Sequence, residues 1–309
     1  MKLSLVVPCY NESGNVKKFI EEARENLCGI EYEVVFINDG STDDTLLRLK
    51  EISKEKKDNL LIISFSRNFG KEAGLYAGLE HATGEYVVII DADLQQPLSV
   101  AREMFEFLEE NTIYDEVVAY QENRKEGKVI TLFKSIFYTM INELSDVPLH
   151  KNASDFRCLR RNVVDAILSM TEYHRFSKGI FSWVGFQSYY RPYDVQKRYA
   201  GETSWTFSAL LNYAAEGMIS FSIKPLRAVT FLGISTSVMA ILYMIVVVFQ
   251  KLLFGNNVPG YSTIVVLILL LGGVQLTVLG IIGEYLGKVH LEVKKRPIYI
   301  AKEIIRSRK

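Results

Sequence analysis

Two aspartates one residue apart, Asp91 and Asp93, directly follow the apolar run at residues 86–90. Side chains in an extended segment alternate between its two faces, so both carboxylates are expected on the same side, with Gln95 next on that alternation. Carboxylate and amide oxygens suit Mg²⁺ or Mn²⁺, ions that usually leave other positions to water and substrate phosphate. The sequence therefore predicts a divalent-metal site formed by Asp91, Asp93 and Gln95.

Two other uses of a carboxylate pair fit the sequence less well. A glycosidase holds its carboxyl groups about 5 to 9.5 Å apart on opposite sides of a sugar ring, and neighbours on one face of one strand do not flank a substrate in that way. A magnesium-dependent phosphatase with an aspartyl nucleophile is expected to carry it after the first strand. The segment from Pro8 to Glu12 offers a phenol, an amide and a carboxylate there instead.

The elements that must position this pair alternate along the N-terminal part of the chain. Short apolar runs rich in β-branched residues are separated by stretches in which apolar residues recur at helical spacing. This alternation predicts an α/β fold with a mainly parallel sheet, right-handed crossovers and helices on both faces. The strands are expected at residues 3–8, 32–38, 60–66, 86–90 and 116–121.

A polar segment follows each of the first four of these runs. Sheets of this kind bind ligands at the carboxyl ends of their strands. The four segments are therefore expected to converge on one crevice. They are PCYNE at 8–12, NDGSTD at 38–43, SRNFGKE at 66–72 and DADLQQP at 91–97.

Three glycines, Gly70, Gly74 and Gly78, recur every fourth residue and so lie on one face of the helix expected there. Neither a P-loop nor a GxGxxG pattern is present. We therefore interpret these glycines as sites of close packing against the sheet rather than as a phosphate cradle.

The composition narrows the classes of partner and compartment. The 36 basic and 36 acidic residues give a formal net charge of zero, which provides no electrostatic reason to expect nucleic acid binding. The 3 cysteines form no CxxC pair, so neither a zinc site nor a disulfide framework is indicated. The chain enters its first strand pattern almost at once, and no cleaved signal peptide is expected.

Two long uncharged segments lie in the C-terminal part, at 228–250 and 263–283. About 23 residues of helix span roughly 34 Å, enough to cross the hydrocarbon core of a bilayer. Two crossings put both outer flanks on one side, and the basic excess at 288–309 predicts that this side is the cytoplasm. The aromatic-rich segment at 204–227 is expected to lie at the membrane interface.

Together, the motifs resemble those of the polyprenyl-phosphate glycosyltransferases of glycosyltransferase family 2, relatives of dolichol-phosphate mannose synthase. The resemblance covers almost the whole chain. It is carried by VVPCYNE, NDGSTD, SRNFGKE, DADLQQP, DFR at 155–157, RFSKGIFSWVGF at 175–186, the two apolar segments and KKRPIYI at 294–300.

The resemblance implies a domain organisation and a reaction. The expected parts are a cytoplasmic GT-A nucleotide-diphospho-sugar transferase domain at 1–203, interfacial amphipathic helices at 204–227, two transmembrane helices at 228–287 and a basic cytoplasmic tail at 288–309. The reaction is an inverting transfer of glucose or N-acetylglucosamine from a UDP-sugar to undecaprenyl phosphate at the cytoplasmic face of a bacterial membrane. Its product serves cell-envelope glycosylation, Mg²⁺ or Mn²⁺ is the cofactor, and a homo-oligomer is expected.

By the same resemblance, Asp155 corresponds to the proposed general base. A phosphate monoester has its second pKa near 6, so the acceptor is already mostly dianionic at neutral pH. We therefore expect Asp155 to orient the acceptor or the sugar at least as much as it removes a proton. Arg198, Asp93 and Asp155 form the expected catalytic set, since Arg198 matches a loop that closes over phosphate in relatives.

The remaining expected site residues bind the donor or the acceptor. Relatives often carry a lysine where this chain has Ser204 and an arginine near Gln121, so Arg124 and Lys134 are the candidate substitutes that bind acceptor phosphate beside Arg198. The expected nucleotide-sugar ligands are Pro8, Tyr10, Glu12, Asp39, Arg67, Lys71, Asp91 and Ala92.

Two other functions remain as alternatives. A processive polysaccharide synthase shares the GT-A domain, but such relatives carry a QxxRW motif and more membrane spans. A membrane-tethered sensor of nucleotide sugars without turnover needs no acceptor-side carboxylate such as Asp155. The donor sugar stays open between UDP-glucose and UDP-N-acetylglucosamine.

Overall fold

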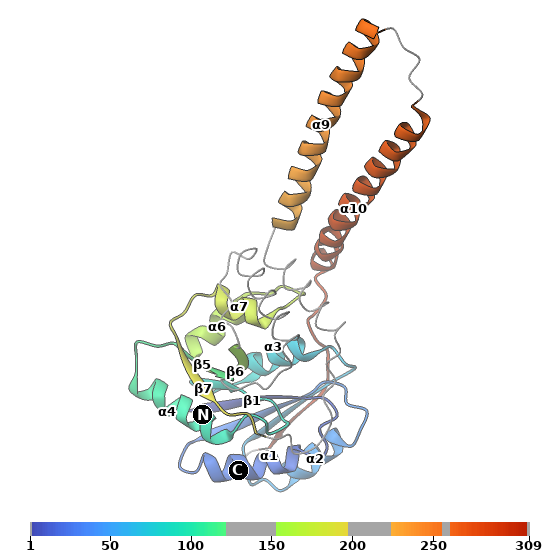
Figure 1. The fold of residues 1–309 in the computed structure, drawn as a ribbon. Coiled ribbons are helices and arrows are strands. Elements are labelled where there is room, and N and C mark those ends of the chain that lie inside the picture. The colour runs from blue at the N-terminus through green and yellow to red at the C-terminus, as the bar shows by residue number, and fades with distance from the viewer. Residues whose placement is uncertain (1, 122–152, 197–223, 255–259, 308–309) are drawn as a thin grey trace.

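The computed structural model describes residues 2–121, 153–196, 224–254 and 260–307 (Figure 1). From β1 to α4 each strand is followed by a helix, as the sequence predicts. The elements are β1 (Leu3–Cys9), α1 (Val16–Asn26), β2 (Tyr32–Asn38), α2 (Thr45–Lys54), β3 (Leu60–Phe65), α3 (Lys71–His81), β4 (Tyr86–Ile89), α4 (Leu98–Glu110), β5 (Glu116–Gln121), β6 (Ala153–Arg160), α6 (Arg161–Ser169), α7 (Ser177–Trp183), β7 (Ser188–Tyr193), α9 (Lys224–Phe254), α10 (Tyr261–Val293) and β8 (Ala301–Ser307).

The strands form one mixed sheet. Within the described residues it is 8-stranded, in the order β7-β5-β6-β4-β1-β2-β3-β8. β4, β1, β2 and β3 run parallel to one another, which confirms the predicted α/β arrangement for the centre of the sheet. β6 runs antiparallel to β4 and β5, and β8 runs antiparallel to β3.

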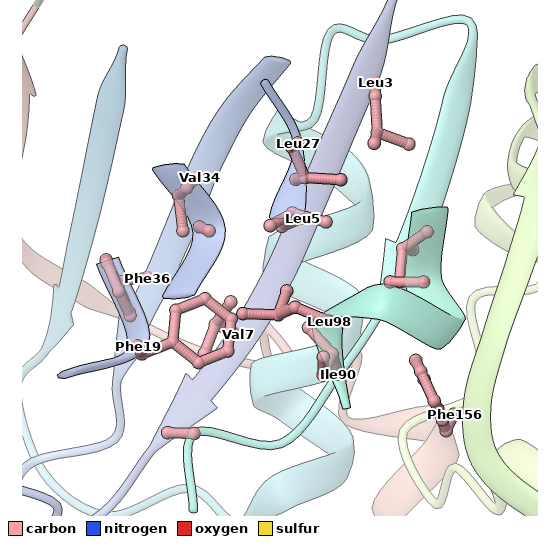
Figure 2. Close-up of a cluster of buried hydrophobic side chains, with 14 of the residues drawn as sticks. Leu3, Leu5, Val7, Phe19, Leu27, Val34, Phe36, Ile90, Leu98 and Phe156 are labelled. Carbon is pink, nitrogen blue, oxygen red and sulfur yellow. The ribbon is translucent and has the colours of Figure 1, made fainter. Parts of the chain in front are cut away.

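Helices cover both faces of the sheet, and each face has its own apolar core. α1, α2 and α4 pack on one face, where Phe19, Phe36 and Phe156 are fully buried. Figure 2 shows part of this cluster, with Val7 lying close to the Phe19 ring. α3, α6 and α7 cover the other face. Because central strands bury side chains on both faces, the sequence of β1 is an almost continuous apolar run.

The glycines of α3 allow this helix to lie close to the sheet. A Cβ atom at Gly78 would stand 2.2 Å from Val6 Cγ1 and 2.8 Å from Ile37 Cδ1. A side chain at this position would therefore force the side chains of Val6 and Ile37, or α3 itself, to shift. The interpretation of these glycines as packing sites is confirmed at Gly78, whereas Gly70 precedes α3 with a φ of +94° and open space around it.

The strand beside β4 comes from a distant part of the chain. β6 pairs with β4 so that Ile89 lies opposite Arg157. Because the two strands are antiparallel, the residues that precede Arg157, Asp155 among them, lie toward the end of β4 that Asp91 follows. The insertion of β6 therefore brings the DFR motif to the end of β4 that carries the DADLQQP segment.

α9 and α10 project away from the sheet as a pair (Figure 1). Each contains a stretch long and apolar enough to cross a membrane, Leu226–Tyr243 and Leu270–Val293, and none of either stretch is buried inside the protein. Phe231 and Leu276, for example, are 75% and 71% exposed. Helices that are apolar all round need an apolar environment, which a bilayer provides.

After α10 the chain returns to the sheet. The ring of Tyr299 stacks on Phe65 with centroids 4.9 Å apart, and its hydroxyl donates a hydrogen bond to Glu80 Oε2 at 2.6 Å. The next residues form β8, which pairs with β3. Part of the segment expected as a basic tail is therefore an edge strand of the catalytic sheet.

Candidate active site

Hydrogen bonds and an ion pair join the four polar loops at the carboxyl ends of β1 to β4. Asn11 N–H donates to Ser41 Oγ at 3.0 Å, and Thr42 N–H donates to Asn11 Oδ1 at 2.9 Å. Asp39 connects the second loop to the third, and Lys71 connects the third loop to the fourth. The predicted convergence of these loops on one site is confirmed.

Asp39 fastens the loop that follows β3. Its Oδ1 accepts a hydrogen bond from Phe69 N–H at 2.6 Å, and its Oδ2 accepts one from Gly70 N–H at 2.9 Å. Burial raises the pKa of Asp39, while these two N–H groups act in the opposite direction. The carboxylate thus has a structural role, and its contact with the nucleoside stays a prediction.

Gly40 makes this close contact between loops possible. Its φ of +61° lies in the left-handed region, and a Cβ atom there would stand 2.4 Å from the backbone carbonyl carbon of Arg67. The guanidinium of Arg67 lies 4.1 Å from the centroid of the Phe69 ring. The backbone of this loop, rather than the Arg67 side chain, therefore packs against the loop after β2.

The DADLQQP segment is a turn and not a continuation of the strand. β4 ends at Ile89, and Leu94 has a φ of +61°, so the alternation expected for Asp91 and Asp93 does not apply. Gln96 fixes Asp91 instead: its Oε1 accepts the Asp91 N–H at 2.9 Å, and its Nε2 donates to Asp91 Oδ2 at 3.1 Å. The prediction that Asp91 and Asp93 lie in an extended segment was wrong, because the chain turns here to enter α4.

Asp93 has a different environment within the same turn. It is 5% exposed, and its Oδ1 accepts a hydrogen bond from Gln95 N–H at 3.1 Å. The turn therefore holds Asp93 through the backbone and Asp91 through a side-chain amide.

Lys71, the first residue of α3, bridges two carboxylates from different strand ends. Its Nζ lies 2.8 Å from Asp91 Oδ1 and 3.1 Å from Asp155 Oδ2. Burial acts to lower the pKa of Lys71, but the two carboxylates outweigh it and hold the pKa well above its usual value. The structure thus joins the predicted metal loop to the predicted acceptor-side carboxylate through one ammonium group.

Asp155 remains ionised in this environment. Burial alone would raise the pKa of Asp155, but the charges of Lys71 and Lys178, with a hydrogen bond from Lys71, hold the pKa at about 2. Lys178 belongs to α7, which covers the same face of the sheet as α3. The carboxylate therefore carries its negative charge throughout the physiological pH range.

Glu72 connects α3 to α7 beside this ion pair. The backbone N–H and the hydroxyl of Ser177 both donate to Glu72 Oε2, the former at 3.0 Å. Burial, reinforced by the charge of Asp155, raises the pKa of Glu72 to about 7. Two neighbouring carboxyl groups therefore have widely separated pKa values, a feature that often marks a functional site.

Arg157, the third residue of the DFR motif, has a structural role. It is 3% exposed, its Nη1 donates to Glu116 Oε2 at 3.1 Å, and its guanidinium lies 3.7 Å from the centroid of the Phe181 ring. These contacts fix β6 between β5 and α7, and with it the position of Asp155.

The other predicted ligands lie around the same strand ends. Pro8 is partly buried in β1, Ala92 is 2% exposed and Tyr10 is 47% exposed. Glu12 is partly buried, and its N–H donates to Thr45 Oγ1 at 2.8 Å. This arrangement offers an exposed aromatic ring beside the crevice. Arg124, Lys134 and Arg198 lie outside the described residues.

Four residues of the site escaped the sequence analysis, namely Gln96, Glu72, Ser177 and Lys178. Gln96 stands in the same motif, but strand alternation favoured its neighbour Gln95. Ser177 and Lys178 belong to RFSKGIFSWVGF, where no local pattern indicates which side chain faces Asp155. Their roles follow from the packing of α7 against α3 and β6.

The predicted ligands of the divalent cation all lie in this turn, and the metal site stays a prediction. The described residues contain no group of three or more His, Cys, Asp or Glu side chains arranged to hold a metal ion. Asp91 and Asp93, with the amide oxygen of Gln95, would supply part of a shell that water and phosphate complete, as Mg²⁺ sites commonly do. The ammonium group on Asp91 Oδ1 also marks this carboxylate as a position that attracts a cation.

Two family models match the chain. The model described as "Glycosyl transferase family 2" matches residues 4–168, and the model described as "GtrB C-terminal hairpin" matches residues 224–289. The first covers β1 to α6, including Asp91, Asp93 and Asp155. The second covers α9 and most of α10.

Several known proteins are similar over nearly the full length. The chain is 44% identical to "Putative glycosyltransferase CsbB" of Bacillus subtilis (strain 168), over 97% of this chain and 91% of that protein. It is 41% identical to "SfII prophage-derived bactoprenol glucosyl transferase" of Shigella flexneri, over 98% of each. Among solved structures, glucosyl-3-phosphoglycerate synthase from Mycobacterium tuberculosis, in complex with Mn²⁺, UDP and glucosyl-3-phosphoglycerate, has a TM-score of 0.48 at 18% identity, over 71% of this chain and 77% of that one.

Proposed function

Because the chain belongs to glycosyltransferase family 2, we propose that it transfers glucose from UDP-glucose to undecaprenyl phosphate at a membrane surface. The family agrees with the resemblance seen in the motifs. Glucose is favoured over N-acetylglucosamine because several similar proteins are named bactoprenol glucosyl transferases. The observation that carries the proposal is the ion pair of Lys71 with Asp91 and Asp155, which joins the donor side of the crevice to its acceptor side.

The proposed reaction is a single displacement at the anomeric carbon. An oxygen of the acceptor phosphate forms the new bond to this carbon on one face while the bond to the UDP oxygen breaks on the other, so the configuration inverts. A divalent cation held by Asp91 and Asp93 would neutralise the negative charge of the diphosphate. We assign Pro8, Tyr10 and Asp39 to the nucleoside of the donor, since they lie at the ends of the neighbouring strands β1 and β2.

The pKa of Asp155 defines what this residue contributes. With a pKa of about 2, its carboxylate is a much weaker base than an acceptor phosphate whose second pKa is about 6. A dianionic acceptor also reaches the transition state without losing a proton. We therefore assign Asp155 an orienting role: its charge holds Lys71, and this pair fixes the geometry of the attacking phosphate or of the sugar hydroxyls.

The C-terminal helices are proposed to hold the catalytic domain at the membrane surface, where the acceptor phosphate lies. The catalytic-domain ends of α9 and α10 lie on the same side (Figure 1), and Lys294, Lys295 and Arg296 follow α10 directly. By the positive-inside rule this side is cytoplasmic, so we propose a two-span hairpin with the catalytic domain and the C-terminus in the cytoplasm. A polyprenyl tail then stays in lipid while its phosphate reaches the crevice. Open space around Gly280 and Gly283 on α10 is compatible with the expected homo-oligomer.

The test uses purified full-length protein in lipid nanodiscs with undecaprenyl phosphate and Mn²⁺ or Mg²⁺. UDP-glucose and UDP-N-acetylglucosamine are supplied separately, and the lipid product is followed by mass spectrometry. We expect a metal-dependent glucosyl lipid that the Asp93→Asn variant does not form. Product only from UDP-N-acetylglucosamine would overturn the choice of sugar. A repeating polymer would indicate a processive synthase, and UDP binding without product from a wide panel of donors would indicate the sensor.

A further inference from the structure

Lys71 stands at a position where a lysine is electrostatically unfavourable. It is the first residue of α3, and a cation at a helix N-terminus opposes the helix dipole. Its side chain is 45% exposed, whereas its ammonium group contacts Asp91 and Asp155. The side chain is therefore only half-buried, and the two carboxylates are what hold its ammonium group in place.

Both oxygens of Asp91 already have a partner, and a cation that binds Asp91 competes most strongly with the partner that carries a like charge. Oδ2 faces Gln96, which is 7% exposed and also accepts the Asp91 N–H. This amide is held on two sides by the turn. Oδ1 faces the ammonium of Lys71, which carries the same sign of charge as an incoming metal ion. We therefore expect the metal ion to displace Lys71, and not Gln96, from Asp91.

We propose that Lys71 is a displaceable counter-cation: a divalent metal ion arriving at Asp91 releases its ammonium group, which stays on Asp155 and becomes available to a phosphate of a substrate. This inference rests on the proposed metal site and deepens it. An ammonium has three N–H donors, and the structure accounts for two of them. Release from Asp91 frees a further N–H donor of Lys71 beside Asp155. Binding of the metal ion thus prepares the acceptor side of the crevice to bind phosphate.

A linkage between Asp155 and metal affinity follows. Asp155 attracts the ammonium and thereby competes with Asp91 for it. Loss of the Asp155 charge strengthens the hold of Lys71 on Asp91, and metal binding weakens, although Asp155 is not a predicted ligand. Such coupling is reciprocal, and the part of it that passes through Lys71 disappears when Lys71 is replaced.

The experiment measures Mn²⁺ affinity by electron paramagnetic resonance of the free ion, on the full chain in detergent, with and without UDP. Lys71→Met is expected to bind Mn²⁺ about fivefold more tightly than the original protein, since a like charge has been removed. Lys71→Arg, which keeps the charge, stays within about twofold of the original. Lys178→Met is the matched control, because its charge acts on Asp155, and it is expected to change the affinity by less than half as much.

A double-mutant cycle completes the test. Asp155→Asn is expected to weaken Mn²⁺ binding more in the original protein than in the Lys71→Met background, where only the direct attraction of Asp155 for the cation is lost. Unchanged or weaker binding in Lys71→Met, or an equal gain in Lys178→Met, would overturn the displacement. Two results would refute the metal site and the displacement with it: the original protein binds no Mn²⁺, or its Mn²⁺ binding persists in Asp93→Asn, with or without UDP. Mn²⁺ binding that responds to Asp93 but not to Lys71 refutes only the displacement.

Discussion

The two sides of the crevice are built by different forces. On the donor side, backbone N–H groups and close packing join the loops after β1, β2 and β3, as at Asp39 and Gly40. On the acceptor side, charged side chains from α3, α7 and β6 meet around Asp155. Backbone contacts preform a surface and change little when a ligand arrives. Charge pairs can exchange partners, so we expect the proposed acceptor side to be the part that responds to metal, phosphate and pH.

The largest effect is expected on the packed side. Gly40→Ala places a Cβ atom 2.4 Å from the Arg67 backbone at a φ of +61°, and we expect it to lower the free energy of unfolding by about 4 kcal/mol, combining backbone strain with overpacking. Gly29→Ala is the control, since Gly29 also has a positive φ, of +87°, but open space around it; its cost is about 1 kcal/mol. Thermal unfolding of the full chain in detergent compares the two. Equal losses would mean that the loop contact contributes nothing.

The second prediction separates the two aspartates by function. Asp39→Asn puts an amide against the N–H of Phe69 or Gly70 and loosens the donor-side loops, so we expect UDP binding to weaken about tenfold. Asp155→Asn keeps the shape but loses the charge that orients Lys71, so UDP affinity stays within about twofold while turnover falls about a hundredfold. Calorimetry with UDP and a turnover assay decide the matter. Near-normal turnover of Asp155→Asn would show that Asp155 neither orients the acceptor or the sugar nor acts as a general base.

The smallest expected effect is a dependence of stability on pH. The pKa of Glu72 is raised to about 7 in the folded chain, so between about pH 4.5 and pH 7 the unfolded chain ionises this group and the folded chain does not. The raised pKa of Glu72 therefore does not destabilise the fold below about pH 4.5, and it destabilises the fold fully above about pH 7. Asp155 has the opposite sign, because its lowered pKa stabilises the fold above about pH 4 and this contribution is lost toward pH 2.

Glu72→Gln keeps the acceptor for Ser177 and removes the charge. We expect it to be about 1 kcal/mol more stable than the original protein at pH 8 and equal to it near pH 4. Denaturant midpoints at the two pH values measure the difference, with Glu51→Gln on the exposed side of α2 as the control. A gain of equal size at both pH values would show that ionisation of Glu72 is not the cause.

The sequence by itself determined the elements that depend on local pattern. Apolar runs and helical spacing predict the strands and helices from β1 to α4, and the order strand, helix, strand implies that the polar segments meet at one edge. Spacing also indicates packing at Gly78 and two apolar helices after residue 223. Because the motifs lie within these short segments, the family could be predicted as well, and so could the convergence of the loops after β1 to β4.

Only the tertiary structure decided which distant segments became neighbours. Antiparallel pairing places β6 beside β4, and Lys71 contacts both Asp155 and Asp91, although about 60 residues separate these two aspartates in the chain. The ion pair of Lys71 and the contact of Glu72 with Ser177 follow from that placement, and so does the return of β8 to β3. Local periodicity specifies which face of an element is apolar, but not which other element covers it. The acceptor side is built from such long-range neighbours, and for this physical reason it was the half that the sequence left open.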